Sequence, residues 1–442
     1  MIKSSFKITS NAKSLSSFSG LFLYSDLISK FEFKNLFGAY LPKLARVRGF
    51  TSFGKFYSVI LGFVAGAECI DDFDSLGNDP LFYKMTHSPS AITIGKFLRS
   101  FNLRQIEQIK NQLPIVAFKI RMWLQPNLYK IIFKMDGTLH QQYGYKMEGV
   151  EFNYKKFRSL SSQNLYDDKG LCYGFELRDG ATHSSVGAVE MLENTFKVIP
   201  KSVQKYFVAD AAYATTDIYN TLINHHTHFA ICLPELVWGS LLKNYGNKMT
   251  WIKTKMNFFQ SEKCEIGEIL YPKKGLSMGK SFLRVVFIRA KKKKLEAGDH
   301  HPYNYYAVVT NINHDEMNGE KIIKFYRKRA NVENFIKDIK NGMDFHHFPC
   351  QSLKANKVWG CLGVLAYNLM RLTSFTLYPR TGCFLKTTRR KIVAFAGEII
   401  LHARSIELKV MDFLSKEVQR LRMILSGSFF KAENADFIPL LE

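Results

Sequence analysis

One stretch near the end of the chain, residues 321–341, has the spacing of a helix with a chemically distinct stripe. It reads KIIKFYRKRANVENFIKDIKN. At about 100° per residue, side chains at offsets of three, seven and fourteen project within roughly 60° of one another. These positions are held by Tyr326, Arg329, Glu333 and Lys340. The pattern predicts one helix with a carboxylate, two cations and a phenol along one side.

The remaining residues of this signature segment (residues 321–341) divide into a buried flank and a solvent flank. The predicted buried flank consists of Ile322, Phe325, Val332, Phe335, Ile336 and Ile339. The predicted solvent flank consists of Arg327, Asn334 and Asp338. An ordinary surface helix with an Arg329–Glu333 ion pair explains the same pattern, so the spacing alone leaves both interpretations open.

Two aspartates upstream follow short apolar runs. Residues 127–136 read NLYKIIFKMD and residues 206–210 read YFVAD, and both runs predict buried strands. Asp136 and Asp210 are therefore expected at strand ends, where an open α/β sheet can hold a metal or a phosphate. Asp136 precedes Gly137, and Asp-Gly is also a common turn, so the residues alone favour a turn there.

Together, the four stripe residues resemble the Y-x2-R-x3-E-x6-K signature of DDE transposases from bacterial insertion sequences. The resemblance implies an RNase H-like core with Asp136, Asp210 and Glu333 as catalytic residues and as ligands of Mg²⁺, for which Mn²⁺ can substitute. Carboxylate oxygens suit both ions. It also implies that Tyr326, Arg329 and Lys340 bind DNA phosphates at the cleaved end.

Other segments resemble one group of these transposases, called here the thirteen-eighty group. DSLGNDP and PSAIT before the core, and THSSVG after Asp179, resemble its D-x-L-x-x-D-P, P-S-x-x-T and H-S-x-x-G stretches. The chain departs from the group at Gly137, where Ser is usual, and at residues 211–213, which read AAY. Neither departure removes a carboxylate. The resemblance covers roughly residues 70–425.

The charge of the chain indicates a polyanionic partner. Its 442 residues carry a formal net charge of +24. Double-stranded DNA, both the terminal inverted repeats and the target, is the expected partner, and an anionic membrane surface is the alternative. No apolar run reaches the roughly 20 residues that a membrane span needs, so we expect a cytoplasmic, nucleoid-associated protein.

The expected fold class is α/β, with an RNase H-like mixed-sheet catalytic core, a β-rich insertion, and helical N- and C-terminal regions. We expect a helical DNA-end-binding region over residues 1–125 and a helical C-terminal region over residues 381–442. The core is expected in two parts, residues 126–233 and 303–380, the second carrying the signature helix. The β-rich insertion lies between them, over residues 234–302.

Several other residues invite a functional or a structural interpretation. Related transposases use an aromatic side chain of such an insertion to receive a flipped base, and Trp238 and Trp251 are the candidates here, although most tryptophans are structural. Asp167, Asp168 and Asp217 are expected to be solvated. Two clusters rich in His and Cys, residues 225–232 and 346–350, lack the intervals of a structural zinc site.

The expected function is that of a DNA transposase that cuts at insertion-sequence ends and joins them to new DNA. The family implies a cut-and-paste route, a DNA hairpin intermediate and a homodimer in the synaptic complex. Two alternatives remain at this point. One is a catalytically silent DNA-binding protein derived from a transposase, and the other is a metal-dependent nuclease without strand transfer.

Overall fold

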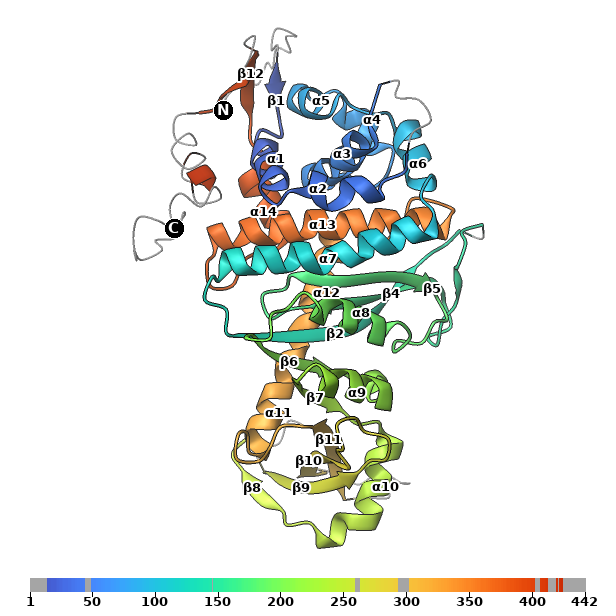
Figure 1. Cartoon of the computed structure of the whole chain (residues 1–442), viewed down its shortest axis with the longest axis vertical. Helices are drawn as coiled ribbons and strands as arrows, with labels where there is room; N and C mark the ends of the chain where they lie inside the picture. Colours follow the sequence, from blue (N-terminus) through green and yellow to red (C-terminus); the bar gives the residue numbers. More distant parts are fainter. Residues whose placement is uncertain are drawn as a thin grey trace, which may run out of the picture. The chain divides into compact units, whose positions relative to one another are not determined.

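The structure is a computed structural model that describes residues 14–43, 49–144, 146–258, 263–292, 302–401, 406–411, 419 and 421–423. The chain divides into two compact units, which Figure 1 draws in colours that follow the sequence. The sheet unit comprises Arg121–Tyr143 and Gly149–Lys337. The helical unit comprises Met1–Ile120, Gly144–Glu148 and Asp338–Glu442.

The described residues of the sheet unit form one mixed sheet of ten strands. Its order is β3-β4-β2-β6-β7-β11-β10-β9-β8, and β5 pairs with β4. The strands are β2 (Lys130–Gln141), β3 (Glu151–Phe152), β4 (Arg158–Tyr166), β5 (Cys172–Asp179), β6 (Gln204–Ala209), β7 (Thr227–Cys232), β8 (Ile252–Thr254), β9 (Cys264–Pro272), β10 (Phe282–Lys291) and β11 (Tyr303–Thr310). β2, β6 and β7 are parallel, and the other pairs are antiparallel. The predicted mixed α/β class is confirmed.

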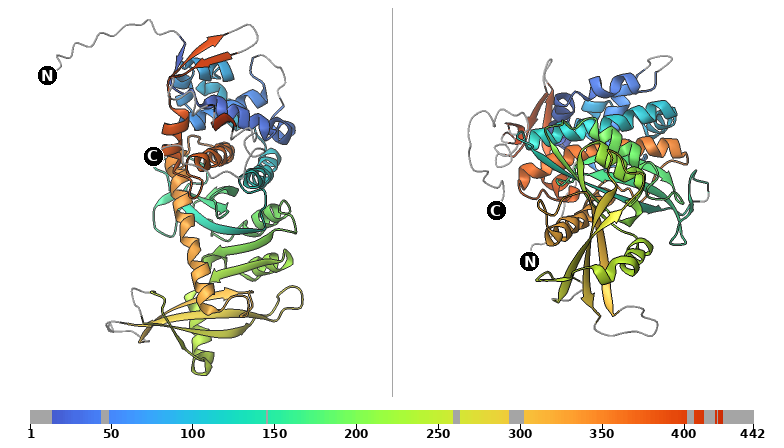
Figure 2. Two further views of the ribbon diagram at one scale, coloured as in Figure 1. Left: turned by 90° about the vertical axis from the view of Figure 1, so that its left-hand side faces the viewer. Right: turned by 60° about the horizontal axis from the view of Figure 1, so that its bottom comes forward.

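The helices of the sheet unit pack on this sheet. They are α8 (Ala188–Phe196), α9 (Thr216–Asn224), α10 (Glu235–Tyr245), α11 (Gly319–Arg327) and the first part of α12 (Asn331–Gly342), with 3₁₀ turns at Ala211–Tyr213, Gly246–Lys248 and Lys328–Ala330. α8 contacts β5, and α9 contacts β7. α11 packs on β7, β9, β10 and β11, as the left view of Figure 2 shows. Ile322 and Ile323 of α11 are buried in one hydrophobic core with Val286 of β10 and Val308 of β11.

The region expected as a β-rich insertion begins with a helix, α10. β8, β9 and β10 follow, and β10 pairs with β9 from Phe282 to Ala290. Because β10 also pairs with β11, which pairs with β7, these strands extend the core sheet instead of forming a separate one. The helix that begins the signature segment, α11, therefore packs on one continuous sheet.

The loop after β4 is not solvated as expected, because Asp167 is buried. Its side chain is 0% exposed and lies 3.7 Å from Arg121, which is itself 2% exposed. Asp167 Oδ1 accepts hydrogen bonds from the backbone N–H groups of Lys169 and Leu171, both at 2.9 Å. Burial raises the pKa of Asp167, and the Arg121 charge opposes that rise. Asp168 is half-buried and lies 3.3 Å from Arg121.

The helical unit is built around α13, which packs against α3 and α6. Its helices are α1 (Leu21–Lys30), α2 (Phe33–Phe37), α3 (Ser52–Ala65), α4 (Asp72–Leu76), α5 (Pro80–Thr86), α6 (Ala91–Arg99), α7 (Leu103–Leu124, whose last turn belongs to the sheet unit), α13 (Leu353–Leu377) and α14 (Leu385–Thr388), with a 3₁₀ turn at Gly38–Tyr40 and a π-helical turn at Arg389–Val393. Trp359 of α13 is fully buried, with its ring centroid 4.4 Å from that of Phe63. Among the described residues, no helix is long and apolar enough to cross a membrane.

The C-terminal region differs from the helical expectation. It contains β12 (Gly397–Leu401) and β13 (Ile406–Lys409), which pair with each other, while β12 also pairs with β1 (Leu15–Ser16). The sequences GEIIL and IELK are rich in β-branched Ile, which favours strands over helix. The pairing with β1 joins residues far apart in the chain and could not be read from this segment alone.

Asp338 was expected to face solvent, but it is only 5% exposed. Its Oδ1 accepts a hydrogen bond from the Leu385 N–H at 2.9 Å. Asn334, one turn earlier on the same face of α12, remains exposed, so the burial of Asp338 is local and comes from the segment that begins α14.

The burial of Asp338 predicts that the helical unit loses stability as pH rises. Burial raises the pKa of Asp338 to about 6, so folding favours its protonated form. That contribution is fully present below the unfolded pKa and is lost as pH rises through about 6. In Asp338→Asn, the amide oxygen can still accept from Leu385. Between pH 4 and 8, the free energy of unfolding of this variant is expected to fall by about 2–3 kcal/mol less than that of the native protein. Urea unfolding at both pH values measures this difference, with the exposed Asp315→Asn as control; the same pH dependence in Asp338→Asn and the native protein would contradict the prediction.

Candidate functional site

Two aspartates lie side by side where two parallel strands part. β2 and β6 pair in parallel up to Met135 and Ala209, so the next residues, Asp136 and Asp210, are neighbours across the sheet. Asp210 follows the end of β6, as predicted. Asp136 does not end its strand, because β2 runs on to Gln141.

The continuation of β2 corrects the expected turn at Asp136-Gly137. β4 pairs with β2 from Lys134 to Gln141 and carries the strand through this dipeptide. Gly137 also has a packing role, since a Cβ there would lie 3.1 Å from Ser184 Oγ. Ser184, in the loop before α8, therefore approaches the sheet closely at this position.

Arg329 lies between the two aspartates. Its Nη2 is 3.3 Å from Asp136 Oδ2 and 3.2 Å from Asp210 Oδ2, and donates to both. The other oxygens accept backbone hydrogen bonds at 3.0 Å, Asp136 Oδ1 from Gly137 and Asp210 Oδ1 from Ala212. Both Oδ2 atoms therefore face one shared position, which here holds the positive charge of a guanidinium.

The electrostatics of this site come from closely spaced, partly buried charges. Burial raises the pKa of Asp136 to about 6; Arg329 opposes the rise, while Asp210 and Glu333 add to it. Burial alone would lower the pKa of Arg329, but Asp136, Tyr326 and Asp210 raise it above its usual value. The site therefore concentrates negative charge that a cation stabilises.

The signature residues do not all lie in one stripe, because the segment is not one continuous α-helix. Tyr326 is in α11, Arg329 is in the 3₁₀ turn, and Glu333 and Lys340 are in α12. Tyr326 is buried, accepts a hydrogen bond from the Tyr306 hydroxyl at 2.8 Å, and has its pKa raised to about 12 by burial. Glu333 is exposed. Lys340 is half-buried and belongs to the helical unit.

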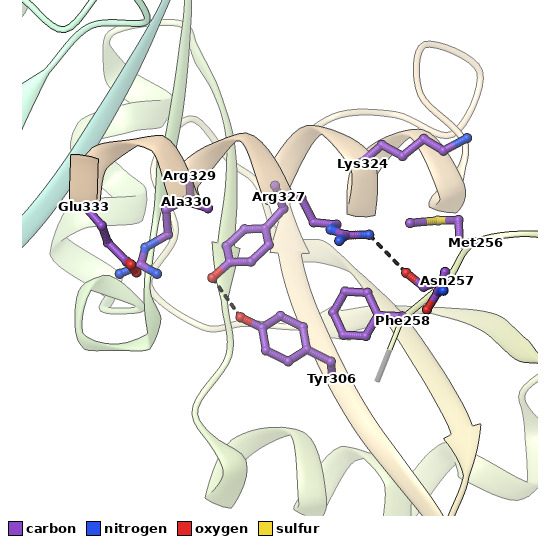
Figure 3. A pocket seen from close by; sticks show the side chains of 10 residues that line it. Met256, Asn257, Phe258, Tyr306, Lys324, Arg327, Arg329, Ala330 and Glu333 are labelled. Carbon is purple, nitrogen blue, oxygen red and sulfur yellow. Dashed lines mark hydrogen bonds between the residues drawn. The ribbon is translucent and has the colours of Figure 1, made fainter. Parts of the chain in front are cut away.

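A pocket of about 920 Å³ opens beside the signature segment. Its lining residues are Met256, Asn257, Phe258, Tyr306, Lys324, Tyr326, Arg327, Arg329, Ala330 and Glu333. Figure 3 shows Glu333 and Arg329 near one end, and Met256 and Asn257 near the other. Arg327 donates to the Asn257 carbonyl oxygen at 3.1 Å. Cations and aromatic rings thus share one cavity, which is lined at one end by Arg329 and Glu333.

The tryptophans proposed from the sequence lie away from this pocket. Trp238 and Trp251 both pack on Tyr305, with ring centroids 5.9 and 6.0 Å away. Tyr305 and Tyr306 are successive residues of β11, so their side chains point to opposite faces of the sheet. The aromatic residues of the pocket are Phe258, Tyr306 and Tyr326, of which the sequence pattern had singled out only Tyr326. The alternation of β11 beneath an amphipathic helix was the signal that could have found Tyr306.

The other sequence candidates have ordinary structural surroundings. Asp217 is exposed in the first turn of α9, as predicted. In the histidine-rich clusters, His225 lies 2.7 Å from Glu193, and His347 lies 3.4 Å from Asp344. Within the described part of the chain, no three His, Cys, Asp or Glu side chains form a set of metal ligands. The aspartate pair supplies two such groups, and Glu333 would have to come closer to supply a third.

Comparison with known proteins places the chain in a family. The family model described as transposase DDE domain group 1 matches residues 2–422. No curated protein matches the chain. Among solved structures, it is similar to one titled "Mos1 transposase paired-end complex with left transposon end", with 14% identity, a TM-score of 0.17, and coverage of 40% of this chain and 65% of that chain. The chain thus spans less than two thirds of that structure. The family model, in contrast, spans nearly the whole sequence, and the protein belongs to the transposase DDE domain group 1 family.

Proposed function

We propose that this member of a transposase family cuts DNA at the ends of an insertion sequence and joins those ends to target DNA. We assign it to the thirteen-eighty group with the Y-R-E-K signature. The observation that carries the proposal is the aspartate pair, Asp136 and Asp210, with both Oδ2 atoms on one cation position and Glu333 on the adjoining helix. The strand order β5-β4-β2-β6-β7, with β4 antiparallel, supports an RNase H-like core.

The donor set fits a hard divalent cation. Asp136 and Asp210 offer carboxylate oxygens to one position, and the raised pKa of Asp136 reflects burial next to other carboxylates that a cation would relieve. Asp136, Asp210 and Glu333 would hold Mg²⁺ or Mn²⁺. Such an ion, when bound, activates the attacking water or 3′-hydroxyl and stabilises the leaving oxygen.

Arg329 has two tasks in this proposal. Without a metal, its guanidinium neutralises the two aspartates and holds them in place. With DNA bound, it turns to the phosphate of the cleaved end, for which a planar guanidinium is well shaped. Its Nε is buried and has no hydrogen-bond partner among the described residues, so the present contacts do not use all its donors. Tyr326 and Lys340 are proposed as further phosphate contacts.

This role of Arg329 predicts a stability effect that depends on metal. In metal-free solution, Arg329→Gln is expected to lower the free energy of unfolding by about 1–3 kcal/mol, because two carboxylates lose their counter-charge. Adding Mg²⁺ or Mn²⁺ is expected to stabilise the variant more than the native protein, since the ion no longer competes with a guanidinium. Thermal unfolding with chelator and with metal measures both effects. Arg327→Gln is the matched control, and equal metal-induced shifts in all three proteins would contradict the account.

The pocket beside the signature segment is proposed to take the DNA end. Lys324, Arg327 and Arg329 supply positive charge at its wall, while Phe258 and Tyr306 supply ring surfaces. This combination suits a hairpin end, in which phosphates need cations and an unpaired base needs a stacking partner. Phe258 and Tyr306 thus take the place of Trp238 and Trp251 as the aromatic residues proposed to receive a base.

The N-terminal region is proposed to recognise the element ends. α5 and α6 are joined by a short turn, and Ser90 caps α6 by accepting from Thr93 N–H at 3.4 Å. α6 buries Ile94, Phe97 and Leu98, and exposes Ile92, Lys96 and Arg99. An exposed apolar side chain with two cations on one helix suits contacts to base edges and phosphates. The net charge of +24 supports DNA as the partner.

Cleavage of DNA carrying the element's own ends, in Mg²⁺, tests the proposal. We expect a homodimer in the synaptic complex and cuts confined to the element ends. Cuts scattered over any duplex would favour the metal-dependent nuclease, and tight end binding without cuts would favour the catalytically silent derivative. Mapping the 3′ and 5′ termini of the products on sequencing gels distinguishes the three.

A further inference from the structure

A short hairpin at the edge of the sheet exposes aromatic and basic side chains that the proposed function does not use. It connects β3 to β4 through residues 153–157, which read NYKKF. β3 pairs only with β4 among the described strands, so the hairpin lies at an outer edge of the sheet. No acidic residue is present in residues 153–157; Glu151 precedes them.

The hairpin tip has a fixed conformation. Asn153 is buried, and its Nδ2 donates to Ser159 Oγ at 2.8 Å while its Oδ1 accepts from the Lys155 N–H at 2.7 Å. Backbone hydrogen bonds also run from Asn153 N–H to the Phe157 oxygen and from Lys156 N–H to the Asn153 oxygen. Lys156 adopts a φ of 63°, which closes the turn. These hydrogen bonds fix the backbone of the tip, and thus the positions from which its side chains project.

The aromatic side chains of this hairpin are unusually exposed. Tyr154 is 82% exposed and Phe152 is 69% exposed. Phe152 ends β3, and Tyr154 lies two residues further on, in the turn. Lys155 and Lys156 are both exposed, and Lys155 Nζ lies 5.7 Å from the Tyr154 ring centroid. A further exposed aromatic, Tyr143, is next to the base of the hairpin, because Gln142 N–H donates to the Arg158 oxygen.

Exposed rings next to lysines have the chemistry that binds unstacked nucleotides. A ring stacks on a base face, and a lysine neutralises the adjoining phosphate. Regular duplex DNA hides its base faces inside the stack, so two exposed rings add little to duplex binding. DNA with a gap, a flap or an opened step offers those faces. The hairpin therefore fits unstacked DNA better than an intact duplex.

We propose that the β3–β4 hairpin is a second DNA-binding surface, on which Tyr154 and Phe152 stack on unpaired bases and Lys155 and Lys156 bind the flanking phosphates. This surface is separate in sequence and structure from the pocket lined by Phe258 and Tyr306. The inference rests on the proposed DNA partner but not on the cutting chemistry. It assigns the hairpin to distorted DNA, such as opened target or flanking DNA.

Fluorescence anisotropy on three DNA probes of one sequence tests the inference: an intact duplex, the same duplex with a short gap, and a single strand. The double variant Phe152→Ala/Tyr154→Ala is expected to bind gapped and single-stranded DNA about tenfold or more weakly, with duplex binding changed less than about twofold. Tyr154→Phe keeps a stacking ring and is expected to bind as the native protein does. Lys155→Ala/Lys156→Ala is expected to weaken all three complexes and to lower their salt dependence.

Tyr129→Ala is the matched control, because Tyr129 is a 69% exposed tyrosine elsewhere in the sheet unit. The inference is overturned if the double variant binds every probe like Tyr129→Ala, or if it loses duplex and gapped binding equally. A change of oligomeric state in the double variant, seen by light scattering, would instead assign the hairpin to a contact between copies. If the native protein binds no DNA at all, the proposed function fails first, and the two failures are thus distinguished.

Discussion

Changing Asp136 to Asn is expected to slow cleavage of DNA ends by about a thousandfold or more, while DNA binding stays within a few fold. Asn keeps the size of the side chain and can still accept from Gly137, but it removes one charge from the shared cation position between Asp136 and Asp210. Glu333→Gln is expected to have the same effect. Single-turnover cleavage of labelled end DNA, measured beside anisotropy for binding, separates the two properties.

Asp217→Asn is the matched control for this experiment. It changes an exposed aspartate of α9 that is close in sequence to Asp210 but is not part of the pair. Its cleavage rate should equal that of the native protein. If Asp136→Asn cuts at the native rate, the carboxylate pair is not the catalytic site, and Asp136 has only a structural role in β2.

The second large effect concerns stability. Arg121→Met is expected to lower the free energy of unfolding by about 3–5 kcal/mol, because it leaves the buried carboxylate of Asp167 without its counter-charge. The double variant Arg121→Met/Asp167→Asn removes both charges and is expected to recover part of the loss. Urea unfolding at neutral pH, followed by circular dichroism, measures all three proteins.

Arg104→Met provides the comparison within the same helix. Arg104 is exposed near the start of α7, so its substitution should change stability by no more than about 0.5 kcal/mol. Equal effects of Arg104→Met and Arg121→Met would mean that the buried ion pair contributes nothing beyond helix propensity. A double variant less stable than Arg121→Met alone would show that hydrogen bonding by Asp167 matters more than its charge.

The elements that the sequence predicted well depend on local patterns. The apolar runs before Asp136 and Asp210 form strands, and the signature segment is helical with most of its predicted apolar flank buried. The mixed α/β class follows from strands that alternate with amphipathic helices. Each of these features can be recognised in a window of ten to twenty residues.

The features that were missed depend on partners far away in the chain. β2 continues past Asp136 because β4 pairs with it, and Asp167 is buried because Arg121 lies against it. No local pattern contains either partner. Arg329 follows the same logic, since its contact with Asp136 joins residues 193 positions apart. A helical projection placed it in a stripe with Tyr326, but the 3₁₀ turn and the two aspartates set its position.

The aromatic candidates from the sequence, Trp238 and Trp251, differ from those that line the pocket for a related reason. Trp238 and Trp251 stand out by composition, whereas Tyr306 looks like any residue of an apolar strand. Which residues of β11 face α11 depends on the register of β11 with β10 and β7, which the sequence of β11 does not contain. The sequence therefore identified Tyr326 of the pocket but not the aromatic residue that β11 contributes to it.

Joining of a cleaved end to a second DNA is the measurement that tests the central claim most directly. A labelled element end is incubated with the native protein, an unlabelled plasmid and Mg²⁺, and the products are separated on a denaturing gel. The account predicts label covalently joined to the plasmid through the 3′ end, and no such product with Asp136→Asn. The account of this protein as an active transposase is contradicted if the native protein binds the ends tightly but never joins them to the plasmid, whether or not it cuts them.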